Sequence, residues 1–250
     1  MNRKINTKEL FTGKAAVYAN YRPSYPRALK EWLLERADLE FVADVGAGTG
    51  IFTAFLQESC RKIIGIEPNE DMRKAFQQKF PTLECLAASA ENIPLPDNSL
   101  SLITAAQAFH WFDAEKFRRE CIRLLKDNGK LLIVWNNAVP TGFSLEVKAV
   151  CQKYCPAFKS GHAGAKTPEE GDRFLREEYF QTLEFFKTPN NMFRTEEEFL
   201  GDQLSRSYAL KDDDPLYGEY LQSLRDVFQK FSKDALVSDE YETTAYFGTV

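Results

Sequence analysis

Three glycines at alternate positions, Gly46, Gly48 and Gly50, constrain the fold of this chain more than any other feature. They directly follow an apolar run, residues 41–45, which is interrupted only by Asp44 and is typical of a strand buried in a parallel sheet. Helical apolar spacing begins just after the last glycine. A doubly wound α/β fold begins its nucleotide crevice in this way, because glycine lets the backbone turn sharply and approach a ligand closely.

A second apolar run, residues 63–66, ends on the carboxylate of Glu67. This acid follows the glycines by about 20 residues, the spacing at which nucleotide-binding folds place an acid that accepts hydrogen bonds from the ribose hydroxyls. A helix-capping acid is the competing interpretation, because the polar residues 69–71 follow closely. The strand, the glycines and the acid agree in their spacing, and this agreement favours a nucleoside site.

The glycine spacing differs from that of dinucleotide-binding proteins, whose third glycine comes three positions after the second, where this chain has Ile51. The pattern Asp44-x-Gly46-x-Gly48-x-Gly50 instead resembles motif I of class I S-adenosylmethionine-dependent methyltransferases.

Two further segments, residues 107–112 and 123–131, are similar to the type-11 branch of that family and, within it, to a group related to trans-aconitate methyltransferase. The resemblance covers residues 11–137, about half of the chain.

The resemblance implies a set of residues that contact S-adenosylmethionine. In the family, an aromatic N-terminal segment closes over the cofactor, where Arg22 could pair with the methionine carboxylate or else stack on a tyrosine at the surface. The loop after the third strand touches the adenine, often through an Asp that this chain replaces with Ser89, beside the backbone N–H of Ala90. The implied cofactor residues are Arg22, Asp44, Gly46, Ala47, Gly48, Glu67, Pro68, Met72, Ser89, Ala90, Glu91 and Gln107.

Methyl transfer from a sulfonium is an in-line displacement, so its main requirement is alignment of the nucleophile with the methyl group and the sulfur. A carboxylate or phenolate nucleophile needs no general base at neutral pH, whereas an alcohol does. His110 is the histidine near the predicted crevice and the candidate base, with packing beside the next helix as its alternative role. The side chains expected to meet the substrate are Tyr18, Trp111, Trp135, Asn137 and Arg206. Trp111 has a core position as its alternative, and Arg206 has an exposed surface position.

The net charge of −5 argues against a nucleic-acid partner. The segment after the fourth predicted strand also lacks the Asn/Asp-Pro-Pro-aromatic motif of family members that methylate nitrogen on nucleic acids or glutamine. We therefore expect a small-molecule substrate that is methylated on oxygen or on carbon, and a carboxylate oxygen is the first choice.

Five scattered cysteines and only two histidines predict neither disulfides nor a metal site. Reduced thiols, with no apolar leader or membrane-spanning run, predict a cytoplasmic protein without membrane contact. The oligomeric state cannot be read from the sequence.

The apolar periodicity and the resemblance together predict a Rossmann-like α/β fold: a doubly wound seven-stranded sheet with an antiparallel last strand, plus a helical cap. Residues 1–137 are expected to form an N-terminal arm and the cofactor-binding half, and residues 138–250 the cap insertions and the last two strands. The predicted strands are 41–45, 62–67, 83–87, 100–106, 130–135, 183–187 and, at an edge of the sheet, 241–248. The predicted helices are 14–20, 26–36, 51–60, 69–80, 114–125, 145–154, 168–178, 195–204 and 212–231.

Two other classes of function stay open at this point. A nicotinamide-dependent oxidoreductase would be stabilised by NADH rather than by S-adenosylmethionine in a thermal-shift assay. A protein that binds the nucleoside without turnover would transfer no labelled methyl group to any component of a cell extract.

Overall fold

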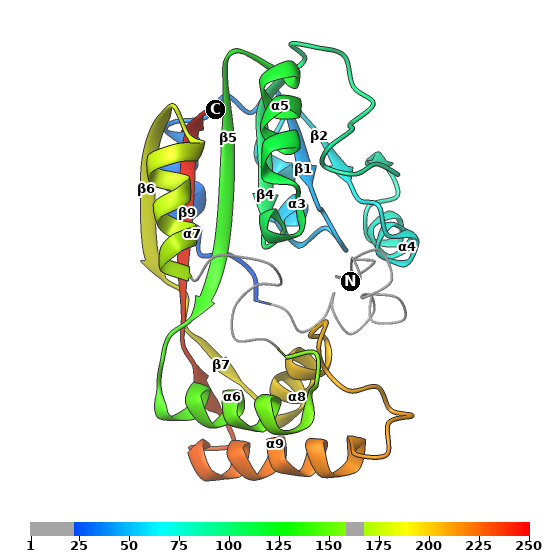
Figure 1. Cartoon of the computed structure of the whole chain (residues 1–250), viewed down its shortest axis with the longest axis vertical. Helices are drawn as coiled ribbons and strands as arrows, with labels where there is room; N and C mark the ends of the chain where they lie inside the picture. Colours follow the sequence, from blue (N-terminus) through cyan, green and yellow to red (C-terminus); the bar gives the residue numbers. More distant parts are fainter. Residues whose placement is uncertain (1–22, 159–167) are drawn as a thin grey trace, which may run out of the picture.

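One seven-stranded sheet, in the order β3-β2-β1-β4-β5-β9-β6, organises the molecule (Figure 1). The computed structural model describes residues 23–158 and 168–250. Strands β1 to β5 pair in parallel, and β9 runs antiparallel to both of its neighbours. The strands are β1 Phe41–Val45, β2 Lys62–Ile66, β3 Cys85–Leu86, β4 Leu100–Ala106, β5 Leu125–Ala138, β6 Thr182–Pro189 and β9 Tyr241–Thr249. The predicted Rossmann-like sheet with an antiparallel last strand is therefore confirmed.

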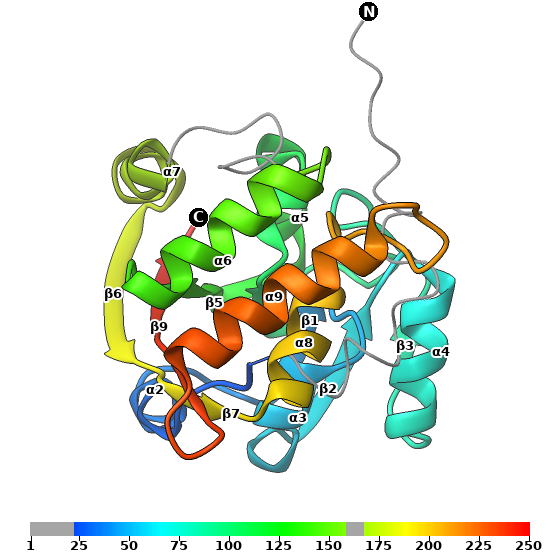
Figure 2. The same ribbon diagram turned by 90° about the horizontal axis from the view of Figure 1, so that it is seen from below.

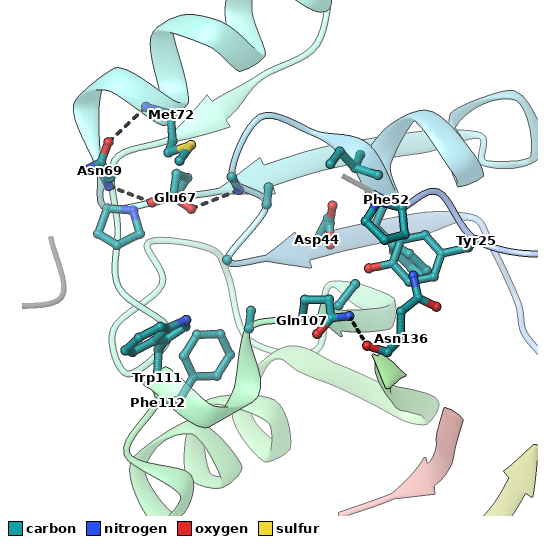
Figure 3. A pocket seen from close by; sticks show the side chains of 18 of the residues that line it. Tyr25, Asp44, Phe52, Glu67, Asn69, Met72, Gln107, Trp111, Phe112 and Asn136 are labelled. Atoms are coloured by element: carbon teal, nitrogen blue, oxygen red, sulfur yellow. Dashed lines mark hydrogen bonds between the residues drawn. The ribbon is translucent and has the colours of Figure 1, made fainter. Parts of the chain in front are cut away.

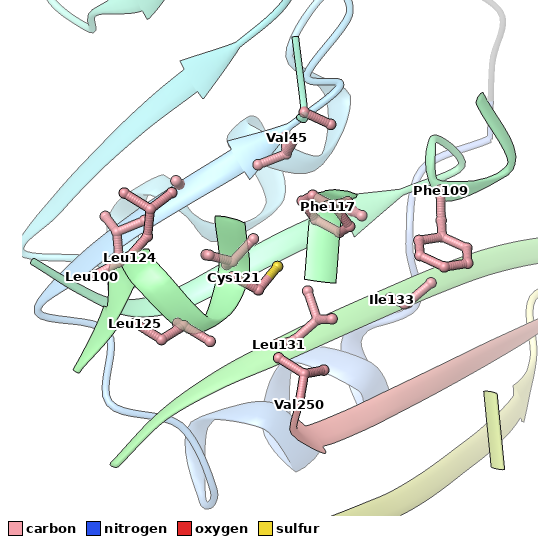
Figure 4. Packing of buried hydrophobic residues seen from close by; sticks show 14 of the residues in the cluster. Val45, Leu100, Phe109, Phe117, Cys121, Leu124, Leu125, Leu131, Ile133 and Val250 are labelled. Carbon is pink, nitrogen blue, oxygen red and sulfur yellow. The ribbon is translucent and has the colours of Figure 1, made fainter. Parts of the chain in front are cut away.

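Helices cover both faces of this sheet because side chains alternate between the two faces along each strand, and the central strands β1, β2 and β4 are mainly apolar and buried. On one face, α5 (Ala114–Leu124) packs Phe117, Cys121 and Leu124 against β4 and β5, with α7 (Pro168–Phe174) and the π-helical turn η3 (Leu175–Tyr179) beside it (Figure 4). On the other face lie α2 (Arg27–Leu34) and α3 (Ile51–Leu56), which the short 3₁₀ turn η1 (Gln57–Ser59) extends.

Helix α4 (Glu70–Lys79) follows β2 and begins close to the carboxyl end of that strand (Figure 1). The side chain of Asn69 accepts a hydrogen bond from the backbone N–H of Met72 and so caps its first turn. Asp113 caps α5 in the same way through the N–H of Lys116. Between β4 and α5 lies the single 3₁₀ turn η2 (Phe109–Trp111).

The remaining elements form a cap with a hydrophobic core of its own. Helices α6 (Gly142–Tyr154) and α9 (Tyr217–Phe231) lie side by side across the end of the sheet, as Figure 2 shows. Helix α8 (Glu196–Leu204) and a small antiparallel pair, β7 (Met192–Arg194) with β8 (Val237–Asp239), complete it. The carboxyl end of β5 points toward this cap (Figure 1), so the cap covers the end of the sheet where such folds bind ligands.

The prediction that residues 241–248 form an edge strand is wrong. Strand β9 lies between β5 and β6, and β6 forms the edge. Nearly every residue of β9 is buried, because both faces are covered and both sides are paired. The pairing with β6 is so close that a Cβ on Gly248 would lie 1.7 Å from the carbonyl oxygen of Thr182. Alternation of small and aromatic residues in this strand therefore reflects tight packing and not exposure of one face to water.

Most other elements agree with the predicted ones to within a few residues. The Thr195–Glu198 capping box predicted for α8 is present. A second capping box, Thr141 with Ser144, makes α6 begin at Gly142 rather than at Leu145. Strand β5 is longer than expected, and the β7–β8 pair has no counterpart in the prediction. The predicted helix 14–20 lies outside the described residues.

Within the part of the chain that the structure describes, no helix combines the length and the apolar character needed to cross a bilayer.

Candidate active site

A pocket lies at the carboxyl ends of β1, β2, β4 and β5 (Figure 3), and Arg206 of the cap is among its lining residues. Backbone and side chains from both halves of the chain line it. They are Pro23, Tyr25, Asp44, Gly46, Ala47, Gly48, Ile51, Phe52, Glu67, Pro68, Asn69, Met72, Ala106, Gln107, Ala108, Trp111, Phe112, Asn136, Arg206 and Tyr241. Eight of the residues expected to bind the cofactor are among them: Asp44, Gly46, Ala47, Gly48, Glu67, Pro68, Met72 and Gln107.

The glycine loop between β1 and α3 has a left-handed backbone at each of its glycines, with φ of 71° at Gly46, 56° at Gly48 and 80° at Gly50. A Cβ at Gly46 would lie 2.5 Å from the Cβ of Ala108, so this position is closed by packing. A Cβ at Gly48 would meet no atom within 4 Å. The loop therefore presents the Gly48 backbone to open space in the pocket, as a cradle for a ligand requires.

The Glu67 carboxylate lies in the wall of this pocket, with a residue exposure of 8%. Its Oε2 accepts a hydrogen bond from the Gly48 N–H at 2.9 Å, and its Oε1 accepts one from the Asn69 N–H at 2.7 Å. Burial raises the pKa of this carboxyl, while the two N–H donors oppose that shift. Because Asn69 caps helix α4, Glu67 is not the capping residue of that helix, and its oxygens face the pocket beside the glycine loop.

Asp44 forms the floor of the site on β1. Its two carboxylate oxygens accept hydrogen bonds from the hydroxyls of Thr53, at 2.7 Å, and Thr104, at 2.9 Å. These bonds tie the first strand to α3 and to β4 directly under the glycine loop. Burial raises the pKa of Asp44 to about 6, and the two threonine hydroxyls only partly offset this effect.

The raised pKa of Asp44 makes stability depend on pH in a defined window. Between pH 3.8, which is the ordinary pKa of an aspartate, and about pH 6, Asp44 is protonated in the folded chain and ionised in the unfolded chain. The free energy of unfolding therefore falls as the pH rises through this window, and the contribution is lost above pH 6. One pKa unit corresponds to about 1.4 kcal/mol. The free energy of unfolding of Asp44→Asn should therefore rise by about 3 kcal/mol relative to that of the wild type as the pH rises from 4 to 7. Urea unfolding of both proteins over this pH range measures the difference, and a difference that does not change with pH would contradict the raised pKa.

Gln107 follows β4 and adopts a left-handed conformation, with φ of 55°, which is unusual for a residue other than glycine. Its Nε2 donates a hydrogen bond to the carbonyl oxygen of Asn136 at 3.0 Å, and its backbone N–H bonds to the carbonyl of Val134. Backbone strain of this kind collects at binding sites, where the surrounding structure holds it in place. The aromatic rings of Trp111 and Phe112 lie on the same side of the pocket (Figure 3).

Arg206, just after α8 of the cap, and Tyr241, the first residue of β9, also line the pocket. Nη2 of Arg206 donates to Oδ2 of Asp202 at 2.6 Å and to the hydroxyl of Tyr241 at 2.9 Å. Asp202 is fully buried, and the Arg206 side chain is 22% exposed. The alternative of an ordinary exposed surface arginine therefore does not hold, because this guanidinium is fixed in the pocket wall by two buried partners.

The prediction that Trp135 and Asn137 face the crevice is wrong. The Trp135 ring packs edge-on against Phe109 and Tyr246, with centroids 6.2 and 5.8 Å apart, within the core under α5. Asn137 is exposed and donates to the hydroxyl of Thr244. Side chains alternate along a strand, so the residue between them, Asn136, faces the pocket instead.

Four other predicted residues do not line the pocket as the structure stands. Ala90 packs in the core, and Glu91 accepts a hydrogen bond from the backbone N–H of Asp113. Ser89 lies opposite Asn92 in a short bridge. The His110 ring lies 4.7 Å from the ring of Trp111, which does line the pocket. An adenine contact from the 89–91 loop and a base role for His110 stay predictions. Arg22 and Tyr18 lie outside the described residues.

The sequence reading missed several pocket residues. Tyr25 packs edge-on against Phe52, with ring centroids 4.8 Å apart, and both rings line the site. The aromatic character of the 18–25 segment was the available signal for Tyr25. Asn136 and Tyr241 carried no signal in the local pattern, because their roles depend on strand pairing between β5 and β9. Within residues 23–158 and 168–250, acidic, cysteine and histidine side chains do not gather in a group that could hold a metal ion.

Comparison with known proteins agrees with this geometry. The model of the methyltransferase domain family matches residues 43–133, which hold the glycine loop, Glu67 and Gln107. An uncharacterized methyltransferase of Mycobacterium tuberculosis is 37% identical over 126 residues, which are 50% of this chain and 51% of that protein. A candidate type II methyltransferase from Anaeromyxobacter dehalogenans shares the fold, with a TM-score of 0.65 and 23% identity over 92% of this chain and 98% of that one.

An uncharacterized methyltransferase-like protein of Schizosaccharomyces pombe is 34% identical over 184 residues, which cover 70% of this chain and 72% of that protein. This likeness extends well beyond the glycine-loop half and into the cap. Together with the matched family domain and the geometry of the pocket, it shows that the chain belongs to the class I S-adenosylmethionine-dependent methyltransferases.

Proposed function

We propose that the pocket binds S-adenosylmethionine and that the enzyme transfers its methyl group to an oxygen of a small molecule, a carboxylate or a hydroxyl. The observation that carries this proposal is the division of the pocket into two chemically different walls. The glycine loop and Glu67 form one wall, and Arg206 with Tyr241 forms the other. Bound S-adenosylmethionine supplies a methyl group on a positively charged sulfur, which a nucleophile can displace.

The residues present fit the adenosyl part of this ligand. The open space at Gly48 accepts ligand atoms close to the backbone. The Glu67 carboxylate has acceptor capacity beyond its two backbone donors and can receive the ribose hydroxyls. The sulfur of Met72 and the ring of Pro68 add apolar surface beside it. We assign the recognition of the nucleoside to these four residues and that of the methionine portion to Gln107.

The opposite wall suits an acceptor that carries a negative charge. The guanidinium of Arg206 is held by the buried Asp202 and by Tyr241, so its orientation is fixed before any substrate arrives. The aromatic rings of Trp111 and Phe112 exclude water from the space between the walls. A carboxylate acceptor is already ionised and needs no base, whereas for a hydroxyl acceptor His110 is the candidate base. A place in the group related to trans-aconitate methyltransferase, whose name denotes an acid, is consistent with the carboxylate.

Two measurements test the proposal. Calorimetry with S-adenosylhomocysteine should show binding, whereas NADH should not bind. Incubation of the enzyme with methyl-labelled S-adenosylmethionine and the small-molecule fraction of a cell extract should give a labelled product. Mild alkali releases labelled methanol from a carboxyl methyl ester but not from an ether, so it separates the two kinds of oxygen. Label found only in nucleic acid would overturn the small-molecule substrate.

A cytoplasmic location stays a prediction from the cysteine usage, and fractionation of expressing cells tests it.

Arg206→Lys tests the anionic end of the pocket. Lysine keeps the positive charge that Asp202 requires but cannot bond to Asp202 and Tyr241 through one planar group. We expect KM for the carboxylate acceptor to rise about tenfold, while the affinity for S-adenosylhomocysteine stays near that of the wild type. Steady-state kinetics with methyl-labelled S-adenosylmethionine and the acceptor found in the extract measures the first quantity, and calorimetry measures the second.

Arg194→Lys is the matched control, because Arg194 also pairs with a buried aspartate, Asp239, at 3.0 Å but does not line the pocket. Equal KM values for the two variants would remove Arg206 from substrate recognition.

A further inference from the structure

The side chain of Asn136 on β5 joins three separate segments of the chain. Its Nδ2 donates to the carbonyl oxygen of Ser24 at 3.2 Å. Its Oδ1 accepts from the hydroxyl of Thr243 on β9 at 2.5 Å and from the side-chain amide of Asn190 at 3.2 Å. With a residue exposure of 8%, the amide is almost completely removed from water, so these bonds satisfy groups that would otherwise be costly to bury.

Ser24 is held from two sides. Besides Asn136, the Nδ2 of Asn190 donates to the same carbonyl oxygen at 2.9 Å. Asn190 is itself fixed, because its backbone N–H bonds to the carbonyl of Tyr241. Ser24 is exposed, so burial of its side chain does not hold this segment in place. Its neighbours Pro23 and Tyr25 nevertheless line the pocket.

The main-chain carbonyl of Asn136 serves the other side of the same pocket. It accepts the hydrogen bond from Nε2 of Gln107, whose left-handed backbone needs support from its surroundings. One residue thus fixes both Tyr25 and Gln107, which come from opposite ends of the cofactor-binding half. Figure 3 shows Asn136 beside Gln107, with Tyr25 and Phe52 adjacent.

The sheet does not require this side chain. Strands β5 and β9 pair through their backbones over eight residue pairs, and Asn136 with Thr243 is only one of them. A purely structural amide would have no reason to reach the 23–25 segment, which lies outside the sheet.

We propose that Asn136 is a positioning residue for the methyl-donor site: its side chain holds the 23–25 segment, and with it Tyr25, against the cofactor end of the pocket. This inference rests on the proposed binding of S-adenosylmethionine in that pocket. Because the amide acts through Tyr25, its loss should weaken cofactor binding without disturbing the sheet.

The test compares Asn136→Asp and Asn136→Ala with Asn137→Ala. The aspartate keeps the acceptor for Thr243 but turns an oxygen toward the Ser24 carbonyl, whereas alanine removes the bond to Ser24 without adding a charge. Asn137 is the adjacent amide on the same strand. Its Nδ2 donates to the Thr244 hydroxyl, and the residue does not line the pocket. Calorimetry with S-adenosylhomocysteine, thermal unfolding, and hydrogen exchange of the peptide that contains Ser24 and Tyr25 are measured for each variant.

We expect both Asn136 variants to raise Kd about tenfold and to speed exchange of the Ser24–Tyr25 peptide, whereas Asn137→Ala changes neither. A variant that lowers the unfolding temperature but keeps wild-type Kd and exchange would show a purely structural role and overturn the inference. Glu67→Ala separates this failure from that of the proposed function. If Glu67→Ala loses affinity while both Asn136 variants keep it, only the positioning role falls. If the wild type binds no S-adenosylhomocysteine, both proposals fall.

Discussion

Glu67→Ala is expected to weaken binding of S-adenosylmethionine by about 1–3 kcal/mol, which is roughly a 5- to 150-fold rise in Kd. Glu67 is one of two carboxylates among the described residues that line the pocket, and the oxygens of the other, Asp44, bond to two threonines. The ribose hydroxyls would then lose their charged acceptor. The Gly48 N–H would lose its partner as well, so the cradle itself would be held less firmly.

Stability should fall as well, because alanine leaves the backbone N–H groups of Gly48 and Asn69 without their acceptor. Glu67→Gln should fall between wild type and alanine, because one amide oxygen remains to accept. Calorimetry with S-adenosylmethionine and urea unfolding measure the two effects.

Glu70→Ala is the matched control for this experiment. Glu70 is an exposed acid three residues further on, where it forms an ion pair with Lys74 at 2.8 Å on the surface of α4. Exposed pairs of this kind contribute little to stability. Its removal should leave Kd unchanged. An affinity for Glu67→Ala equal to that of Glu70→Ala would exclude Glu67 from the binding site.

Alanine substitutions at two glycines of the same loop should do different damage. At Gly46 the main loss should be in stability, and at Gly48 it should be in ligand binding. Gly46→Ala forces an L residue into a left-handed backbone and places its Cβ 2.5 Å from that of Ala108. The left-handed backbone costs about 1–2 kcal/mol and the overlap about 1–3 kcal/mol, so the free energy of unfolding should fall by about 2–5 kcal/mol. This loss is a large part of the stability of an ordinary domain.

Gly48→Ala has the unfavourable backbone but no overlap, since its Cβ would meet open space. It should lose only about 1–2 kcal/mol of stability, and the chain should stay folded. Its methyl group would project into the space that we assign to the ligand, so Kd for S-adenosylhomocysteine should rise more than about tenfold. Urea unfolding measures the free energy of unfolding of Gly46→Ala and of Gly48→Ala, and calorimetry measures the Kd of each variant for S-adenosylhomocysteine.

Gly218→Ala provides the control for glycine replacement as such. Gly218 lies in helix α9, has no positive φ, and a Cβ there would meet nothing within 4 Å. Alanine at this position should leave binding unchanged and stabilise the helix by about 0.5–1 kcal/mol. If Gly48→Ala retained full affinity, the open space above Gly48 would not be the ligand site.

The cofactor half of the site could be predicted because its signals are local. A buried strand, a glycine turn and an acid at the tip of the next strand are short patterns, and parallel strands bring Gly48 and Glu67 to one edge of the sheet. Hence Asp44, Gly48 and Glu67 all lie in the pocket wall. The capping box at Thr195 is local in the same sense, and it was predicted correctly.

The substrate half could not be predicted in the same way. The middle of strand β5 is buried on both faces, so its apolar pattern does not indicate which side chains point toward the pocket. Trp135 and Asn137 were predicted to face the pocket, whereas Asn136 lines it in the structure. Arg206 was predicted to lie at the site, but its partner Tyr241 was not. The two residues are 35 positions apart, and their contact joins the cap to the start of β9.

The sequence by itself determined most of the strands and helices, the glycine loop and the acid after β2, because each is a short local pattern, and the resemblance to the family added the Rossmann-like sheet that the strands form. The tertiary structure alone decided that β9 enters between β5 and β6, that Asn136 reaches Ser24, and that Asp202 holds Arg206 against the pocket. Those contacts join residues far apart in the chain, and their free energy depends on which surfaces become buried together, a property that no local pattern of residues contains.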